Sequence, residues 1–469
     1  MEKTKGEILE EKLFNECKNG FEGLDENKKE VIFKFSDDYI NFLNKAKTER
    51  LFTKETIKLL DYNGFKDIFN VKEIKPGDKI YYVNRSKAVY AAVIGEDKLS
   101  NGLNLIGAHI DSPRLDLKPN PLYEDGGFAL FKTHYYGGIK KYQWTTIPLA
   151  IHGVVVKSSG EVVDINIGEE DTDPVFTITD LLPHLAKDQM KKTLSDGIAG
   201  EDLNLLVGSI PYEDEKVSEK VKLNILSILN KKYGITERDF NSAELELVPA
   251  FKARSLGFDE SMVAAYGQDD KSCAYTSLRA LLDLDKLQRT AVLLLTDKEE
   301  IGSMGNTGMY SANFEHFVSL LLEKTLEKEF NCLNKCLCNS EMLSADVTSA
   351  SDPTYDFVDE KNNAAYLGRG LCLIKYTGGR GKSGASDASA EFVAKVRDIF
   401  ESNDLLYQIS DMGKIDVGGG GTIAYILADR GIDVLDAGIP VLSMHAPYEV
   451  ASKFDIYNAY ECYKAFFED

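Results

Sequence analysis

The chain has 469 residues, of which 43% are hydrophobic and 28% are charged, a balance typical of a globular protein large enough for two domains. Its formal net charge of −21 argues against nucleic acid and anionic membrane surfaces as partners, because phosphate binding needs a basic face. The sequence has no apolar stretch long enough to predict a transmembrane helix, and its beginning is too charged for a signal peptide. We therefore expect a cytoplasmic protein.

Helical spacing of apolar residues predicts helices at 26–48, 272–284 and 387–402. Short apolar runs of strand length lie between and around them. Helices that alternate with short buried strands predict an α/β sandwich around a parallel or mixed sheet. The runs are YAAVIG (90–95), LNLIGAH (103–109), TAVLLLT (290–296), EMLSADV (341–347), LCLIKY (371–376), IDVLDAG (432–438) and PVLSMHA (440–446).

The middle of the chain has a different pattern. Residues 145–180 alternate between apolar and polar positions as strands do, and residues 186–220 are polar and irregular. The helix–strand alternation resumes near residue 248. We predict that residues 113–247 form an inserted, strand-rich domain, and that 1–112 and 248–469 together form the α/β domain.

Four of the apolar runs end at, or are followed by, residue types that commonly serve as metal ligands. LNLIGA ends in His109, EMLSA in Asp346 and PVLSM in His445, while TAVLLLT is followed by the acidic stretch 297–300. In open α/β sheets, sites form just beyond the carboxyl ends of the strands. Imidazole and carboxylate groups that converge there predict a hydrolytic metal site, with zinc favoured and cobalt or manganese as alternatives.

Two metal ions about 3.5–4 Å apart need a bridging carboxylate. The motif GQDDKSC supplies a candidate at Asp269, just before the helix at 272–284, with Asp270 as the alternative. Asp111 lies two residues after His109 and on the same face of an extended strand, so it can orient the imidazole ring. Glu299 and Glu300 are adjacent and point in different directions, so one can bind metal while the other acts as general base.

Two other motifs have simpler explanations. The stretch GGRGKSG (378–384) fails the phosphate-loop pattern, because Tyr376 occupies the position of the first glycine. We expect the glycine run at 418–422 to let the backbone approach the site closely, with anion binding at a helix start as the alternative. The cluster CLNKCLC (332–338) has no second cysteine or histidine pair, which favours a helix-to-strand segment over a zinc site.

The motifs GAHIDSPRL, GQDDKSC, DKEEIGS, LSADV and MHAPYEV, in this order, resemble the aspartyl aminopeptidase / vacuolar aminopeptidase I family. The resemblance is continuous from about residue 80 to the end. It implies a metal-dependent aminopeptidase that removes N-terminal residues from peptides. It also implies a three-layer α/β/α catalytic domain with an inserted β-rich dimerisation domain, and homo-oligomers in which dimers assemble into dodecamers.

The resemblance also implies a role for each residue of the site. One metal would have His109 and Asp346 as terminal ligands, the other would have Glu300 and His445, and Asp269 would bridge the two.

Glu299 would be the general base, and Asp111 would support His109. Histidines that usually follow the metal-binding aspartate in eukaryotic aspartyl members are replaced here by Ser349 and Asp352. This departure leaves the preferred N-terminal residue open.

The resemblance suggests further residues that contact the substrate. Cations for an acidic substrate side chain are available at Lys375, Arg380 and Lys382. His184, in LLPHLA, resembles the region of the insert that reaches the site of a partner subunit.

Two other functions would fit parts of this pattern. A two-metal deacylase or dipeptidase could use the same ligands, but the resemblance through the insert and the glycine run favours an aminopeptidase. A non-enzymatic scaffold would typically lack a ligand or the base, and this sequence has all of them.

Overall fold

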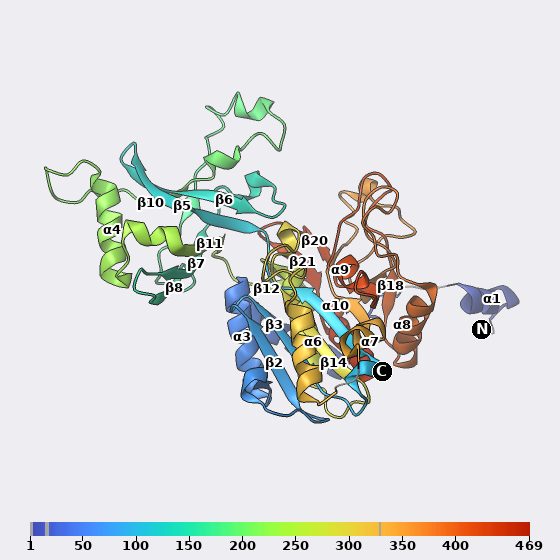
Figure 1. The fold of residues 1–469 in the computed structure, drawn as a ribbon. Helices are drawn as coiled ribbons and strands as arrows, with labels where there is room; N and C mark the ends of the chain where they lie inside the picture. The colour runs from blue at the N-terminus through green and yellow to red at the C-terminus, as the bar shows by residue number, and fades with distance from the viewer. Residues whose placement is uncertain (1–2, 15–17, 328–329) are drawn as a thin grey trace.

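The computed structural model describes residues 3–14, 18–327 and 330–469. Figure 1 shows an α/β part that contains the C-terminus and, above it, a strand-rich part coloured cyan to green. The N-terminal helix α1 (Lys5–Leu13) points away from both, and none of its residues is buried.

The α/β part is built on a nine-stranded mixed sheet in the order β1-β2-β3-β14-β4-β15-β19-β17-β18. Its central strands β14, β4, β15 and β19 are mutually parallel. Their residues are almost all buried, as expected for strands covered on both faces. The strands are β1 (Lys66–Asp67), β2 (Lys79–Asn84), β3 (Ala88–Val93), β4 (Leu103–His109), β14 (Thr290–Thr296), β15 (Glu341–Ser344), β17 (Leu371–Ile374), β18 (Tyr407–Ile409) and β19 (Asp433–Gly438).

Helices cover both faces of this sheet, each over a separate apolar core. The predicted three-layer α/β/α sandwich is therefore confirmed. One face carries α2 (Glu26–Leu43), α3 (Glu49–Tyr62), α5 (Gln268–Leu282), α8 (Ala390–Ser402) and α10 (Lys453–Glu468). The other carries α6 (Asn313–Lys324), α7 (Cys332–Cys338) and α9 (Ala424–Ala428).

Helix α2 illustrates how the sequence sets these layers. Asp25 accepts a hydrogen bond from the backbone N–H of Lys28 and so caps the helix start. Ile32, Phe35 and Tyr39 recur at helical spacing and are buried against the sheet side of the helix.

The strand-rich part is inserted between β4 and α5. It holds a seven-stranded sheet in the order β8-β7-β11-β5-β6-β10-β9, whose strands run from Arg114 to Pro249. A separate apolar core around the fully buried Trp144 stabilises it. Its strands are β5 (Arg114–Asp125), β6 (Phe128–Tyr136), β7 (Leu149–Val156), β8 (Val162–Ile167), β9 (Thr177–Ile178), β10 (Leu205–Gly208) and β11 (Ala243–Pro249).

The insert also contains a helix that the sequence analysis did not predict, α4 (Lys220–Tyr233). It ends at Gly234, whose φ of 66° is in the left-handed region. Val221 is buried in it, and Ile225, Leu226, Leu229 and Tyr233 pack against the core of the insert while partly exposed.

A five-stranded sheet lies beside the main one, in the order β12-β13-β21-β20-β16. It corrects one expectation. Pro440–Leu442 of the run PVLSM form strand β20 of this small sheet, so only three of the four runs that lead to candidate ligands belong to the main sheet. The strands are β12 (Arg254–Leu256), β13 (Met262–Ala265), β16 (Thr348–Ser349), β20 (Pro440–Leu442) and β21 (Glu449–Ser452).

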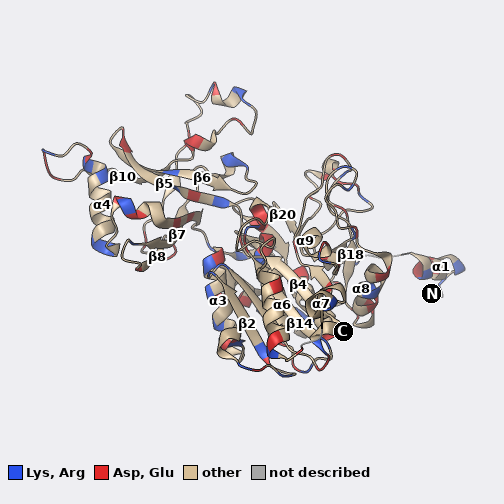
Figure 2. Ribbon diagram, viewed as in Figure 1, with Lys and Arg blue, Asp and Glu red and all other residues tan. Residues whose placement is uncertain are grey.

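A largely buried cluster of charged residues links the insert to the α/β part through ion pairs and hydrogen bonds. Lys47 Nζ lies 2.8 Å from Glu169 Oε1 and donates to the carbonyl of Pro249 at 2.8 Å. His152 and Lys252 contact the same glutamate at 2.9 and 3.1 Å. Elsewhere, acidic and basic positions are intermixed over both parts (Figure 2).

Within the described residues, no helix combines the length and the apolarity that crossing a bilayer requires. The cysteine-rich stretch forms α7 and leads into β15, as predicted. None of the metal-capable clusters among the described residues includes a cysteine.

Candidate metal centre

Three adjacent parallel strands bring most of the predicted ligands to one edge of the main sheet. His109 is the last residue of β4, and Asp346 lies just beyond β15. Glu299 and Glu300 lie on a short 3₁₀ turn, η7 (Glu299–Ile301), which follows β14. The carboxyl ends of these strands therefore form the crevice that the sequence predicts.

Asp269 stands between two histidines. Its Oδ1 is 3.2 Å from Nε2 of His109, and its Oδ2 is 3.2 Å from Nε2 of His445. It lies in the first turn of α5, where the backbone of Asp269 and Asp270 is not helical and the peptide bond between them is cis.

The ligand atoms fall into two groups, within each of which they lie no more than 4.8 Å apart. One group contains His109, Asp269 and Asp346, and the other contains Asp269, Glu300 and His445. Each group combines imidazole nitrogen with carboxylate oxygen, the donor set that zinc accepts. The groups share Asp269, as a two-metal site requires.

The electrostatics of the crevice also fit bound cations. Burial raises the pKa of Glu300 and of Asp346 well above the usual range, and the charge of Asp269 adds to the effect. Oε1 of Glu300 is buried without a hydrogen-bond partner. Two divalent ions would neutralise this concentration of carboxylates.

Asp270, the alternative bridge, belongs to neither group. Its Oδ2 accepts a hydrogen bond from the backbone N–H of His109 at 3.1 Å. The geometry therefore favours Asp269 as the bridging residue.

Asp111 is fully buried beside His109, and its carbonyl and carboxylate oxygens lie 3.0 and 3.3 Å from the histidine Nδ1. This contact leaves Nε2 directed at the metal position. The carboxylate also accepts hydrogen bonds from the backbone N–H groups of Glu299 and Glu300, at 3.2 and 3.3 Å. Asp111 thus holds both a ligand and the turn that carries the acidic pair.

Glu299 faces the same crevice but belongs to neither ligand group. Its Oε2 is 3.9 Å from Nε2 of His109. Burial raises the pKa of Glu299 to about 7. A carboxylate beside the metal positions, with its oxygens not committed to them, has the geometry of a general base.

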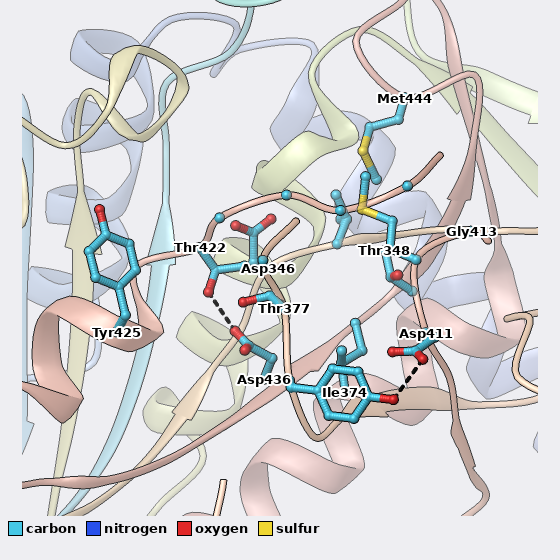
Figure 3. A pocket seen from close by; sticks show the side chains of 18 of the residues that line it. Asp346, Thr348, Ile374, Thr377, Asp411, Gly413, Thr422, Tyr425, Asp436 and Met444 are labelled. Carbon is cyan, nitrogen blue, oxygen red and sulfur yellow. Dashed lines mark hydrogen bonds between the residues drawn. The ribbon is translucent and has the colours of Figure 1, made fainter. Parts of the chain in front are cut away.

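A cavity of about 490 Å³, shown in Figure 3, is lined in part by Asp269, Glu299, Glu300, Asp346 and His445. Thr422 donates to Asp436 at 2.7 Å, and Tyr376 donates to Asp411 at 2.9 Å, both drawn as dashed lines. Asp436 was not among the predicted site residues, although it follows the apolar residues Val434 and Leu435 in the run IDVLDAG.

The glycine run forms part of the cavity wall. Gly419 has a φ of 126°, and a Cβ there would lie 2.5 Å from the carbonyl oxygen of Gly378. The run therefore packs closely against the backbone at Gly378, and residues 418–422 line the same cavity as the proposed ligands.

The predicted substrate-binding residues lie in different places. Arg380 and Lys382 line the cavity, whereas Lys375 is not among its lining residues. Nζ of Lys382 lies 3.8 Å above the ring of Tyr376. His184 is exposed on the insert.

The sequence pattern of the aminopeptidase I zinc metalloproteases (M18) matches residues 42–467, which is most of the chain. The chain belongs to the M18 family. This membership makes it a metal-dependent aminopeptidase, as the motifs predicted, and zinc is the metal of the family description.

Other M18 proteins are similar over nearly the whole length. A probable M18 family aminopeptidase 1 of Clostridium acetobutylicum is 50% identical over 458 residues, covering 97% of this chain and 98% of the relative. The crystal structure of an M18 aminopeptidase from Thermotoga maritima aligns with a TM-score of 0.93 and 47% identity, covering 97% of this chain and all of the other. A yeast M18 aminopeptidase solved as a dodecamer shares the fold, with a TM-score of 0.74 and 22% identity over 94% of this chain and 97% of the other.

Proposed function

We propose that this M18 aminopeptidase works with two divalent metal ions per chain, of which zinc is favoured. His109 and Asp346 would be the terminal ligands of one ion, Glu300 and His445 those of the other, and Asp269 would bridge them. The observation that carries the proposal is that two ligand groups share one carboxylate, whose oxygens face different histidines at 3.2 Å.

When bound, the metal pair would polarise the carbonyl of the first peptide bond and acidify a water molecule. Glu299 then takes the proton of that water, the oxygen adds to the carbonyl carbon, and the C–N bond breaks. Glu299 returns the proton to the leaving nitrogen. The Asp111 carboxylate keeps Glu299 in place through its backbone N–H.

The cavity would hold the N-terminal residue of the peptide. Ile374, Met412 and Met444 supply apolar lining, and Lys382 supplies a cation. Because Lys382 lines the cavity, we propose that it contacts the substrate. His184 would act only across a subunit interface, and the site supplies no argument for Lys375.

The insert is proposed to be residues 113–247 and to form the dimer interface, with dimers assembling into a dodecamer in the cytoplasm. The yeast relative solved as a dodecamer supports this proposal. So do exposed apolar side chains on one loop of the insert, which a second subunit could cover. They are Leu181, Leu182, Leu185, Met190 and Leu194.

Replacing Glu299 by Gln tests the mechanism, because it removes the base but no proposed ligand. We expect turnover of aminoacyl substrates to fall by at least about 10³-fold with the zinc content unchanged. Glu300→Gln, the same change one residue along, should instead lower the zinc content. Near-normal activity of Glu299→Gln would refute the assigned role.

A panel of peptides separates the aminopeptidase from a deacylase that uses the same ligands. We expect cleavage of peptides with a free amine and none of their N-acetylated forms. Preferential cleavage of the acetylated forms would favour the deacylase.

A further inference from the structure

One segment of the insert reaches the metal centre of its own chain. It is Tyr136–Gly138, which begins at the last residue of β6 and precedes the 3₁₀ turn η3 (Lys141–Trp144). It contacts the site at two points, one beside Asp111 and the other beside His445.

At the first point, the hydroxyl of Tyr136 donates to Oδ2 of Asp111 at 2.8 Å. The same carboxylate orients His109 and accepts the backbone N–H groups of Glu299 and Glu300. Tyr136 therefore supplies one of the donors that fix the carboxylate on which both groups depend.

The ring of Tyr136 is itself held in place. The guanidinium carbon of Arg114 lies 3.9 Å from the ring centroid. Arg114 is buried and forms ion pairs with Asp116 and Glu246 of the insert and with Glu49 of helix α3. Burial and the charge of Asp111 raise the pKa of Tyr136 well above its usual range, so the hydroxyl keeps its proton and donates.

At the second point, Nδ1 of His445 lies 2.8 Å from the carbonyl oxygen of Gly138. An N–H at Nδ1 donates to this carbonyl and leaves Nε2 free for metal. A Cβ on Gly138 would lie 3.2 Å from Nδ1 of His445. A Cβ on Gly137, whose φ is 73°, would lie 3.3 Å from Oε2 of Glu300. Glycine at both positions lets the segment approach this closely.

We propose that Tyr136–Gly138 is a positioning segment of the metal centre, which orients Asp111 through the Tyr136 hydroxyl and His445 through the Gly138 carbonyl. The insert thereby contributes to both metal positions of its own chain. This role is separate from dimerisation, and it rests on the two-metal site proposed above.

The test compares Tyr136→Phe with Tyr135→Phe in the full-length enzyme. Both remove one phenol oxygen from neighbouring residues of β6, but Tyr135 is 42% exposed and its hydroxyl has no hydrogen bond within the described residues. The readouts are the zinc dissociation constants, measured by competition with a chromophoric chelator, the thermal stability of metal-free protein, and kcat and KM at saturating zinc.

We expect Tyr136→Phe to weaken zinc binding by about 10-fold or more, because the Asp111 carboxylate that orients His109 loses a hydrogen-bond donor. At saturating zinc, kcat should remain low with KM little changed, because the Asp111 carboxylate that anchors the backbone of Glu299 is itself held less firmly. Tyr135→Phe should match the wild type. Zinc affinity and kcat within twofold of the wild type for Tyr136→Phe would overturn the inference, as would equal losses in the two variants.

Gly138→Ala examines the second contact independently. The added methyl group presses on His445, so we expect the second zinc ion to be lost at concentrations that saturate the wild type, while the first stays bound. Two ions retained with unchanged affinity would overturn this half of the inference. A wild type that binds no zinc would refute the proposed metal site itself, and the inference with it.

Discussion

At the scale of single residues, the site depends on the geometry of one shared carboxylate. Asp269 contacts His109 with one oxygen and His445 with the other, whereas Asp346 and Glu300 each belong to a single group. Loss of Asp269 should therefore affect both metal ions, whereas loss of Asp346 or Glu300 should affect only one.

Substitution of these aspartates by asparagine tests that difference. We expect Asp269→Asn to lose both zinc ions and Asp346→Asn to lose one, because an amide is a poor ligand and only Asp269 serves both positions. Metal analysis after dialysis gives the number of ions per chain. Asp270→Asn is the matched control, and it should retain both ions because Asp270 lies outside both groups. Metal loss in that control but not in Asp269→Asn would show that Asp270, and not Asp269, bridges the two ions.

The sequence indicated residues that the fold brings together, because strand ends are visible in the apolar pattern. The sequence did not decide whether Asp269 or Asp270 bridges the metals. The orientation of these neighbours depends on the non-helical start of α5, which the spacing of residues does not reveal. Tyr136 and Gly138 carry no motif. They meet Asp111 and His445 only through the fold, so spacing along the chain contains no signal for them.

At the scale of secondary structure elements, the apolar runs predicted strands, but they did not predict which sheet each strand joins. β4 and β14 each have seven residues of continuous burial. β20 has only three residues, and its apolar run gives no indication that it pairs in a separate sheet. Sheet membership depends on long-range pairing, which a local pattern does not encode.

The junction between the insert and the α/β part depends on the charge of Glu169. Burial alone would raise the pKa of Glu169, but the contacts with His152 and Lys47 outweigh it and lower that pKa to about 2, from an ordinary value of 4.5. A carboxyl with a lowered pKa stabilises the fold above its ordinary value and loses that contribution as pH falls towards the folded value.

The thermal midpoint of Glu169→Gln should therefore lie below that of the wild type at neutral pH, and the gap should narrow as pH falls from about 4.5 to about 2. Calorimetry across this range measures the gap. The exposed Glu161 of the same insert provides the control, since Glu161→Gln should show little difference at any pH. A gap for Glu169→Gln that stays constant down to pH 2 would contradict the assignment.

At the scale of the whole molecule, the fold and the metal site are separable. The cores on the two faces of the main sheet consist of apolar side chains and include none of the proposed ligands. Burial of these side chains supplies most of the folding free energy, so the architecture does not require the metal.

Removal of metal should consequently abolish aminopeptidase activity while the far-ultraviolet circular dichroism stays unchanged. Added zinc should restore the activity. Zinc should also raise the thermal midpoint, because binding to the folded state at 100 times the dissociation constant adds about 3 kcal/mol per ion. Loss of helical signal on chelation would contradict this separation.

The order of the elements along the chain also has a consequence in time. During synthesis His109 emerges first, the entire insert follows, and Asp269 appears only afterwards. The last proposed ligand, His445, precedes only β21 and α10, and α10 packs against α5 in the core that supports Asp269. A growing polypeptide on the ribosome therefore lacks a supported, complete ligand set until α10 is made. The proposed metal site is thus assembled only after nearly the whole of this sequence has been translated.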